Sequence, residues 1–229
     1  MAYNWTFNLI DKTDIAVIFE IGSRDLLDAN TLAQHYDTIV HAFEPNPDCV
    51  KICKKNNYDS RVIFNELAVS TQVGPIDFYS FDLDKYNNMG ASSIYEIDFV
   101  KNRPISDPDY GRTDVQKKIS VYSISIDEYC KQNFIIPDMI CMDVQECELE
   151  VLKSASNILP KVKYIILEAS NVPTYKNGCD FYDINTFLID NNFRHIANNE
   201  HQKLNYNISL NLDSKNYSFC DLLYVNQKL

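Results

Sequence analysis

The sequence predicts an α/β fold with a mostly parallel β-sheet, helices on both faces and an antiparallel last strand. Residues 15–47 have the pattern of a strand, a tight turn, a helix and a second strand, which is a βαβ unit. Strands and helices continue to alternate along the chain, as they do in parallel sheets. Two final strands, at residues 193–197 and 219–225, have no helix between them, which indicates the antiparallel strand.

The composition favours one domain over residues 1–229. The chain is 45% hydrophobic, which is enough for one sizeable core. Its formal net charge of −11 disfavours binding to nucleic acids and to anionic membranes, because both require a positive surface. Seven cysteines are scattered along the chain as expected for reduced thiols, and neither a secretory leader nor a membrane-spanning run is visible. We therefore expect a soluble, cytoplasmic protein.

The turn after the first strand has the features of a ligand site. That strand is apolar except for Glu20, as in a central parallel strand. Gly22 follows it, and a residue without a Cβ lets a ligand lie against the backbone. Ser23 and Asp25 are placed to cap a helix that begins near Leu26, whose free N–H groups can bind a carboxylate or a phosphate.

The second strand, residues 38–43, ends on Glu44, twenty-two residues after Gly22. A carboxylate at this spacing can accept hydrogen bonds from both hydroxyls of a ribose. Pro45 and Asn46 turn the chain into the next helix, with Asn46 as its N-cap. A pyrophosphate site would need three glycines, so the expected cofactor has no pyrophosphate. The alternative is an ordinary βαβ unit whose acids face solvent by chance.

A third strand is predicted over residues 61–69. Its end, at Leu67 and Ala68, would lie beside Glu44 and could hold a planar base through backbone groups and apolar contact. Residues 74–81 predict an additional strand after a turn.

Two segments could cover such a site. Residues 82–118 are polar and rich in turn residues, and a loop of this length indicates either a lid that carries Ser92 and Ser93 or an exposed excursion. Residues 1–14 contain the tryptophan, Trp5, and form either a short helix over the site or an ordered tail.

Two buried strands in the second half end on acids. Residues 137–144 deliver Asp143, and residues 163–168 end on Glu168. Ligands of open α/β sheets bind outside the carboxyl ends of the strands, so Asp143 should face the same crevice as Gly22. A further strand is expected over 119–126, and helices over 48–57, from 125 onward, over 147–159 and over 182–191.

Six short motifs now point to a family. They are, in order, FEIGSRD, AFEPNP, ELAVS, GASS, SIDEY and DVQECELEVLKSA. In order and spacing they resemble the FkbM-type methyltransferases, over about residues 15–170. The resemblance implies a Rossmann-like, seven-stranded class I methyltransferase sheet with an antiparallel last strand. It also implies S-adenosylmethionine as cofactor and methylation of a hydroxyl on a small molecule, a sugar or a glycan.

Transferred position by position, the resemblance also implies the site residues. Cofactor contacts fall on Glu20, Gly22, Ser23, Asp25, Glu44, Pro45, Asn46, Leu67, Ala68 and Ser93. The first four would line the methionine part, Glu44 would bind the ribose hydroxyls, and Leu67 with Ala68 would flank the adenine. Two positions depart from the family pattern. Glu146 stands where a glycine is usual, which affects the substrate side, and Leu26 stands where a second glycine often follows, which affects the helix start.

For methyl transfer to a hydroxyl, the protein has only to align that hydroxyl and to manage one proton, because the cofactor carries the reactivity. Asp143 is the first candidate for orienting the cofactor ammonium or accepting that proton, and Glu168 is the second. Alternatively, Asp143 only caps backbone N–H groups. A magnesium ion between the two acids is chemically reasonable, but no third ligand is identifiable, so no metal is expected.

Two other functions remain open at this point. A nicotinamide-dependent oxidoreductase would share the opening βαβ unit, although the missing glycines argue against it. A non-catalytic module with the same fold would bind the cofactor without turnover, and the departures at Glu146 and Leu26 are the reason to consider it.

Overall fold

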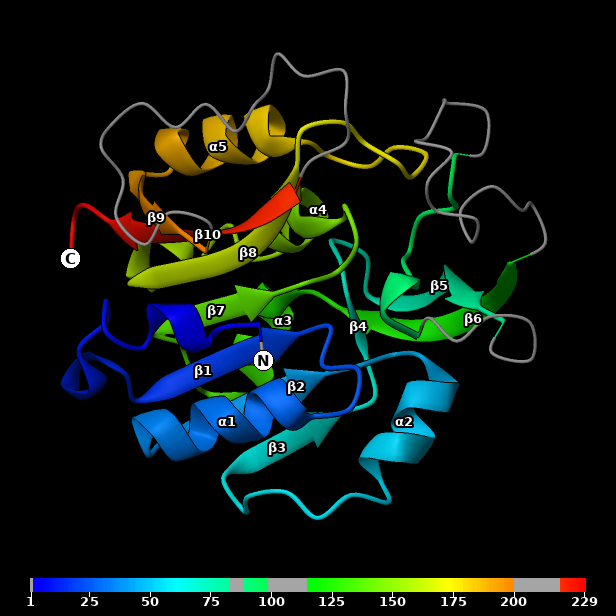
Figure 1. Cartoon of the computed structure of the whole chain (residues 1–229), viewed down its shortest axis with the longest axis horizontal. Helices are drawn as coiled ribbons and strands as arrows, with labels where there is room; N and C mark the ends of the chain where they lie inside the picture. The colour runs from blue at the N-terminus through cyan, green and yellow to red at the C-terminus, as the bar shows by residue number, and fades with distance from the viewer. Residues whose placement is uncertain (1, 83–88, 99–114, 200–218) are drawn as a thin grey trace.

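A computed structural model describes residues 2–82, 89–98, 115–199 and 219–229 and confirms the α/β fold (Figure 1). Its main sheet has seven strands in the order β3-β2-β1-β7-β8-β10-β9. These strands are β1 (Val17–Ile21), β2 (Ile39–Phe43), β3 (Val62–Asn65), β7 (Met139–Met142), β8 (Tyr164–Ser170), β9 (Phe193–Asn198) and β10 (Phe219–Asn226). The last strand, β10, runs antiparallel to both of its neighbours, and the other adjacent pairs are parallel, as predicted.

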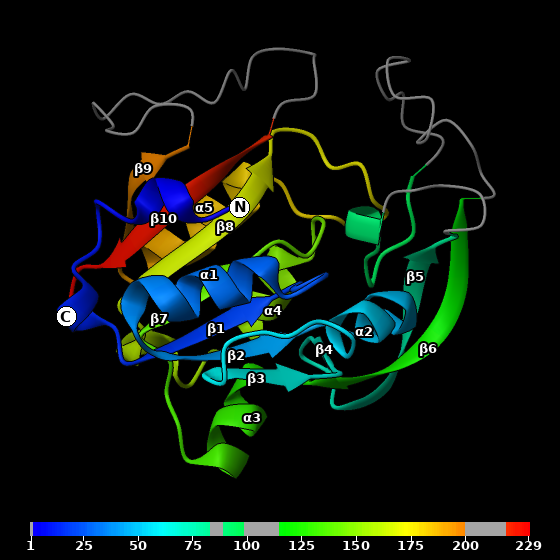
Figure 2. The ribbon, with the colours of Figure 1, turned by 60° about the horizontal axis from the view of Figure 1, so that its bottom comes forward.

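Helices cover both faces of this sheet (Figures 1 and 2). They are α1 (Leu27–Tyr36), α2 (Pro47–Cys53), α3 (Ile126–Asn133), α4 (Glu148–Lys153) and α5 (Phe181–Asp190). Because side chains alternate along a strand, Phe19 of β1 packs in the core beneath α3, α4 and α5. Its neighbour Ile18 packs in the other core, with α1 and the N-terminal residues Tyr3 and Ile10. None of the described helices is long and apolar enough to cross a membrane.

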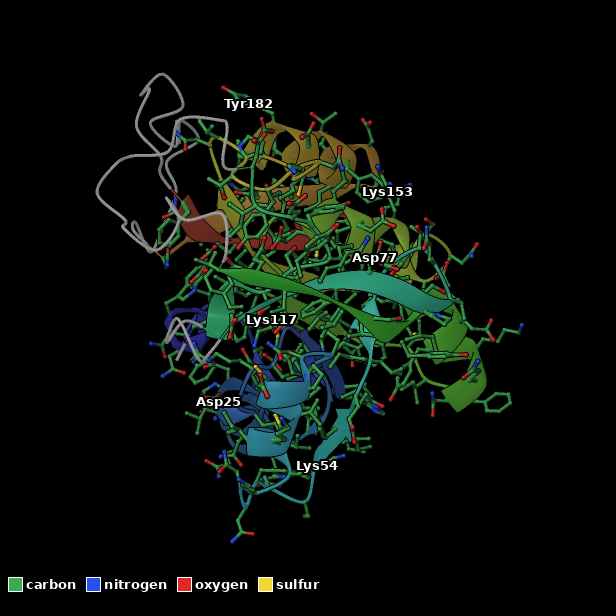
Figure 3. The ribbon with its side chains drawn as sticks, turned by 90° about the vertical axis from the view of Figure 1, so that its right-hand side faces the viewer. Asp25, Lys54, Asp77, Lys117, Lys153 and Tyr182 are labelled. Carbon is green, nitrogen blue, oxygen red and sulfur yellow. The ribbon has the colours of Figure 1, made fainter. Side chains whose placement is uncertain are left out.

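A second, smaller sheet corrects the prediction for residues 61–69. It consists of β4 (Ala68–Val69), β5 (Gly74–Phe81) and β6 (Gln116–Ile124), in the order β4-β6-β5. The predicted third strand is therefore divided between two sheets. Its first half pairs with β2 only as far as Asn65, because β2 itself ends opposite that residue and turns away. Figure 3 shows the side of the molecule on which the small sheet lies, with Asp77 on β5 and Lys117 on β6 labelled.

The predicted cap at Asn46 is confirmed, whereas two predicted helices end early. The side chain of Asn46 accepts the N–H of Asp48 at 3.0 Å, and Ser125 accepts the N–H of Glu128 at 3.1 Å. The helices predicted over 48–57 and 147–159 end at Cys53 and Lys153 instead. In the second case the Ser154 hydroxyl donates to the carbonyl of Val151 at 2.7 Å and so competes with the helical hydrogen bonds.

The predicted lid, residues 82–118, lies partly outside the described residues. Its described residues are 82, 89–98 and 115–118. Among them a 3₁₀ turn, η3, spans Met89–Ala91, and the last three already belong to β6, so the predicted loop ends earlier than expected. Ser93 forms an isolated bridge with Tyr79 of β5, so this part of the segment is attached to the small sheet. Whether the segment acts as a lid stays a prediction.

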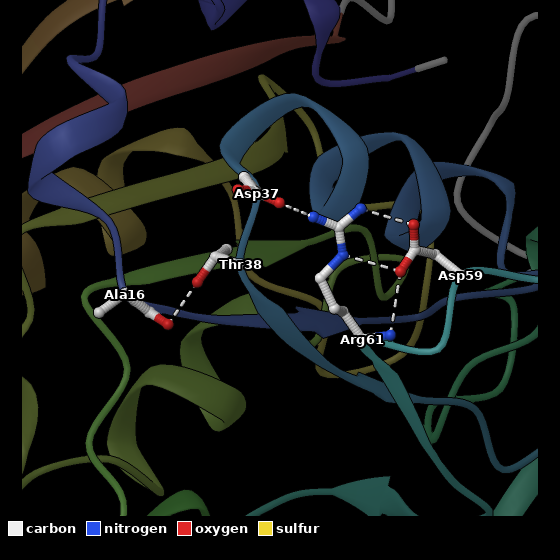
Figure 4. A network of polar contacts seen from close by, with 5 residues as sticks. All are labelled: Ala16, Asp37, Thr38, Asp59 and Arg61. Atoms are coloured by element: carbon white, nitrogen blue, oxygen red, sulfur yellow. Dashed lines mark hydrogen bonds and ion pairs between the residues drawn. The ribbon is translucent and has the colours of Figure 1, made fainter.

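Polar contacts fix the strands at their amino ends (Figure 4). The hydroxyl of Thr38, just before β2, donates to the carbonyl of Ala16, just before β1. The guanidinium of Arg61, just before β3, pairs with Asp59 at 2.6 Å and also with Asp37. These contacts join the chain segments that lead into β1, β2 and β3. The site lies at the opposite, carboxyl ends of these strands.

Candidate functional site

A cavity of about 600 Å³ lies at the carboxyl ends of β1, β2 and β7, the edge where a ligand site was predicted. Of the predicted residues, its lining includes Glu20, Gly22, Ser23, Glu44, Pro45, Leu67, Ala68, Ser93 and Asp143. Asp25, Asn46 and Glu168 do not belong to the lining. The structure thus brings most of the predicted residues together around one space.

Gly22 is required by the close approach of two strands. Its φ is +88°, a conformation that favours glycine, and its N–H donates to the carbonyl of Phe43 at 3.0 Å. A Cβ at this position would overlap the carbonyl oxygen of Asp143 and would lie 3.3 Å from Cγ1 of Val144. The missing side chain therefore allows the end of β7 to pass beside the turn after β1, in addition to opening the backbone to the cavity.

The helix start after this turn differs from the prediction. Ser23 does not cap α1, because its hydroxyl donates to the carboxylate of Glu20. Asp25 does accept the N–H of Leu27, at 3.1 Å, so that part of the prediction is confirmed. Leu26, the N-cap residue, has a φ of +66° and is buried. The backbone here thus has the left-handed conformation that glycine adopts most readily, although the residue is leucine.

Glu44 connects the turn after β1 with the turn after β2, beside the cavity. Its carboxylate accepts the N–H of Arg24 at 2.9 Å with one oxygen and the N–H of Asn46 at 2.7 Å with the other. Only 6% of Glu44 is exposed, and this burial raises its pKa to about 7 despite the two hydrogen bonds. Asn46 lies behind the lining, where its amide donates to the Ser92 hydroxyl at 3.1 Å. Glu44 therefore presents a fixed carboxylate to any ligand in the cavity.

Glu20 is a second buried carboxylate of this wall. It is 2% exposed, and burial raises its pKa to about 8, against the opposing effect of the hydrogen bond from Ser23. Its position on β1 and the hydrogen bond from the Ser23 hydroxyl hold Glu20 in the cavity lining. Its negative charge is costly unless a positive group enters the cavity.

The two predicted catalytic acids occupy different environments. Asp143 follows β7, donates its N–H to the carbonyl of Ile21 at 3.1 Å and accepts the Gln145 side-chain amide at 2.8 Å. Burial raises the pKa of Asp143. Glu168 lies on β8 opposite Asp221 of β10, outside the cavity lining, and its pKa is raised to about 9 by burial and then by the charge of Asp143. Asp143 therefore faces the cavity, and Glu168 does not.

The N-terminal segment covers the cavity, which decides between the two alternatives for Trp5. Residues 2–5 line the space, and residues 4–6 form a 3₁₀ turn, η1 (Asn4–Thr6). The N–H of Ala2 donates to Asp28 at 2.9 Å, which ties the segment to the first turn of α1. Sequence reasoning missed Asp28, although an acid in the first helical turn after a glycine turn was a usable signal.

A reciprocal pair, Asn199 just after β9 and Asp221 of β10, completes the lining. The side-chain amide of Asn199 donates to the carboxylate of Asp221 at 2.9 Å, and the N–H of Asp221 donates back to the Asn199 side chain at 3.1 Å. Burial raises the pKa of Asp221 to about 7, with a further contribution from Asp143. No local signal marked this pair, because it reaches the cavity only through the antiparallel placement of β10.

The cavity is strongly acidic. The carboxylates of its lining belong to Glu20, Asp28, Glu44, Asp143 and Asp221, and Arg24 is the one lysine or arginine among the described lining residues. Apolar side chains, including Phe43, Leu67 and Phe78, form part of the remaining wall. Among the described residues no group of three or more side chains is arranged to hold a metal ion. The arrangement suits an organic ligand that combines positive charge with a flat apolar part.

Comparisons with known proteins agree with this geometry. The family model described as "Methyltransferase FkbM domain" matches residues 20–195. The curated 2-O-methyltransferase NoeI of Sinorhizobium fredii is 29% identical over 175 residues, which cover 74% of this chain and 69% of that protein.

Solved structures share the fold at low sequence identity. A candidate S-adenosylmethionine-dependent methyltransferase from Listeria monocytogenes is 7% identical, with a TM-score of 0.51, over 98% of this chain and 97% of that one. The StiE O-MT structure is also 7% identical, with a TM-score of 0.50, over 98% of this chain and 72% of that one. At these identities the likeness shows the fold alone.

The close approach at Gly22 can be tested by adding one methyl group. We expect Gly22→Ala to lower the free energy of unfolding by about 2–4 kcal/mol, from backbone strain together with overlap with the Asp143 carbonyl. Urea denaturation measures this. Gly74→Ala is the matched control, because Gly74 also has a positive φ but has no heavy atom within 4 Å of an added Cβ. Equal losses in the two variants would show that the contact with β7 does not matter.

Proposed function

Since the chain belongs to the FkbM methyltransferase family, we propose that this S-adenosylmethionine-dependent methyltransferase methylates a hydroxyl group of a sugar, a glycan or another small hydroxylated molecule. The observation that carries the proposal is the acidic cavity at the carboxyl ends of β1, β2 and β7, where Glu44 bridges two turns. The hydroxyl as acceptor is supported by the relative NoeI, which is named as a 2-O-methyltransferase.

The residues of the cavity fit S-adenosylmethionine. The cofactor carries a sulfonium and an ammonium against one carboxylate, and the carboxylates of the lining outnumber Arg24. Glu44 would accept the ribose hydroxyls, because each of its oxygens makes a hydrogen bond to one backbone N–H and retains a further lone pair. Leu67 and Ala68 would flank the adenine, and Pro45 lies next to Glu44 in the same wall. Glu20, Gly22 and Ser23 would then lie near the methionine part.

Bound S-adenosylmethionine supplies an activated methyl group, so the protein has to align a hydroxyl and accept one proton. We assign that task to Asp143, which lines the cavity next to Gly22 and is oriented by Gln145. Its raised pKa favours proton uptake. Glu168 lies outside the lining, so we do not give it this role. Asp25 and Asn46 would act indirectly, by holding the helix start and Ser92.

Membership of the family argues against a nicotinamide-dependent oxidoreductase.

The seven cysteines are free thiols, and all are buried. The cytoplasmic location, the absence of a nucleic-acid partner and a single domain over residues 1–229 stay predictions.

Methyl transfer itself is the decisive test. Purified protein is incubated with S-adenosylmethionine and a panel of unprotected methyl glycosides and other small alcohols, and mass spectrometry detects S-adenosylhomocysteine and methylated product. We expect a methyl ether to form together with S-adenosylhomocysteine, and we expect Asp143→Asn to lower kcat by about 10²–10⁴-fold. Tight cofactor binding without product from any acceptor would favour a non-catalytic module instead.

The role of Glu44 can be tested through cofactor affinity. We expect Glu44→Gln to weaken S-adenosylmethionine binding by about 1–3 kcal/mol, because the neutral amide loses the charge-assisted hydrogen bonds to the ribose. Isothermal titration calorimetry measures this difference. Glu66→Gln is the control, since Glu66 is an exposed partner of Lys54 outside the cavity. Unchanged affinity in Glu44→Gln would mean that another acid binds the ribose.

Cofactor binding should also depend on pH. Burial raises the pKa of Glu44 and Asp221 to about 7 and that of Glu20 to about 8, so near neutral pH part of each population is protonated. A cationic ligand favours the ionised carboxylates, so protons should leave on binding.

We therefore expect S-adenosylmethionine affinity to rise from pH 5.5 to pH 7, by up to about tenfold per pH unit for each carboxylate that ionises. The stability of the free protein changes with pH in the opposite direction to the affinity. A folded pKa above the unfolded value costs stability as pH rises from about 4.5 to about 8. Calorimetry in buffers of different ionisation enthalpy counts the released protons, and affinity that is flat or falls with pH contradicts the assignment.

A further inference from the structure

Glu146 is a buried carboxylate for which the proposed methyl transfer has no direct use. It follows Asp143 by three residues, is 8% exposed and does not line the cavity. Its φ is +67°, and that of Gln145 is +57°. Each of these left-handed residues therefore lowers the stability by about 1–3 kcal/mol, unless its contacts offset the cost.

Glu146 is hydrogen-bonded to one loop, residues 171–179, which follows β8. Its carboxylate accepts the N–H of Thr174 with both oxygens, at 2.7 and 2.6 Å, and also accepts the Thr174 hydroxyl. It accepts the N–H of Tyr175 at 2.8 Å. The backbone carbonyl of Glu146 accepts the N–H of Cys179 at 2.9 Å. Both halves of the loop are thus bonded to a single residue.

The loop is shaped around this carboxylate. A Cβ at Gly178 would overlap Oε2 of Glu146 and would lie 3.0 Å from its Cβ. The glycine therefore leaves the space that the carboxylate occupies. Such complementarity indicates that the two positions work together and that Glu146 is not an incidental surface acid.

The other side of the loop holds a wall of the cavity. The Tyr175 hydroxyl donates to the carbonyl of Ala91 at 2.8 Å, and Tyr175 forms an isolated bridge with Ile97. The N–H of Asp98 donates to the carbonyl of Thr174 at 2.9 Å. Figures 1 and 2 show the loop after β8 reaching the segment around η3. Around this turn, Gly90, Ser92, Ser93 and Ile94 line the cavity.

We propose that Glu146 is the positioning residue that holds the loop 171–179 against residues 90–97 and thereby fixes the acceptor side of the cavity. This inference rests on the proposed function. The groups assigned to adenosine, namely Glu44, Leu67 and Ala68, come from other elements, and Asn46 joins Glu44 to Ser92 of the wall. Ser93, which the resemblance places among the cofactor contacts, we assign to the acceptor side. The hydroxyl of Ser93 donates to the carbonyl of Gln145 at 2.9 Å, so the wall and the end of β7 next to Asp143 are joined directly. Loss of Glu146 should therefore disturb the alignment of the acceptor with Asp143 while the cofactor still binds.

Glu146→Gly isolates the carboxylate, because glycine adopts a positive φ readily and leaves the backbone conformation intact. In the cofactor-bound variant, we expect hydrogen exchange over residues 171–179 and 90–97 to become at least about tenfold faster. S-adenosylmethionine affinity should stay within about threefold of the unsubstituted protein. For the alcohol or glycoside that proves to be methylated, KM should rise by about tenfold or more, with a smaller change in kcat.

Two further variants make the test specific. Glu146→Gln keeps an acceptor for the Thr174 N–H and should restore most of the protection and of the acceptor KM. Glu96→Gln breaks only the exposed ion pair between Glu96 and Lys176 at the rim of the same loop and should change neither. Both comparisons use the full chain with S-adenosylmethionine bound.

Unchanged exchange in Glu146→Gly would overturn the inference, and so would a loss of cofactor affinity as large as the loss of acceptor affinity. These outcomes differ from a failure of the proposed function. If the unsubstituted protein methylates no acceptor, the proposed function fails, but the exchange comparison still shows whether Glu146 fixes the wall.

Discussion

The close contact between the turn after β1 and the end of β7 organises the site. Gly22 lies against the main chain of Asp143, and its N–H and that of Ser23 both donate to the carbonyl of Phe43. A single residue without a side chain thus brings the ends of three strands together. Because the backbones approach so closely here, Glu20, Glu44 and Asp143 are presented to one cavity.

These carboxylates make the cavity a favourable place for a cation. Their pKa values are raised because burial penalises the charged form, and Arg24 is the one lysine or arginine in the described lining. A sulfonium and an ammonium would provide the missing positive charge. The positive charge of S-adenosylmethionine would thus offset the electrostatic cost of burying these carboxylates.

Two departures from the family pattern have a structural explanation. By the resemblance to the family, glycine is usual at the position of Glu146 and frequent at that of Leu26, and both residues have positive φ angles in this chain. The backbone at both positions therefore has a conformation that glycine adopts readily, while the side chains make contacts that glycine could not make. Leu26 is buried in the core on the α1 face, and Glu146 holds the loop after β8. Sequence reasoning identified both positions but could not assign what the new side chains contact.

The sequence by itself determined the α/β class, the antiparallel last strand, the turn at Gly22 and the cap at Asn46. These features depend on periodicity and on hydrogen bonds between residues close in the chain. Tertiary structure alone decided the division of residues 61–69 between two sheets and the meeting of Trp5, Asp28 and Asp221 around the cavity. Such meetings join segments far apart in sequence, and no local pattern encodes them because they arise only when the packed sheet brings the segments together.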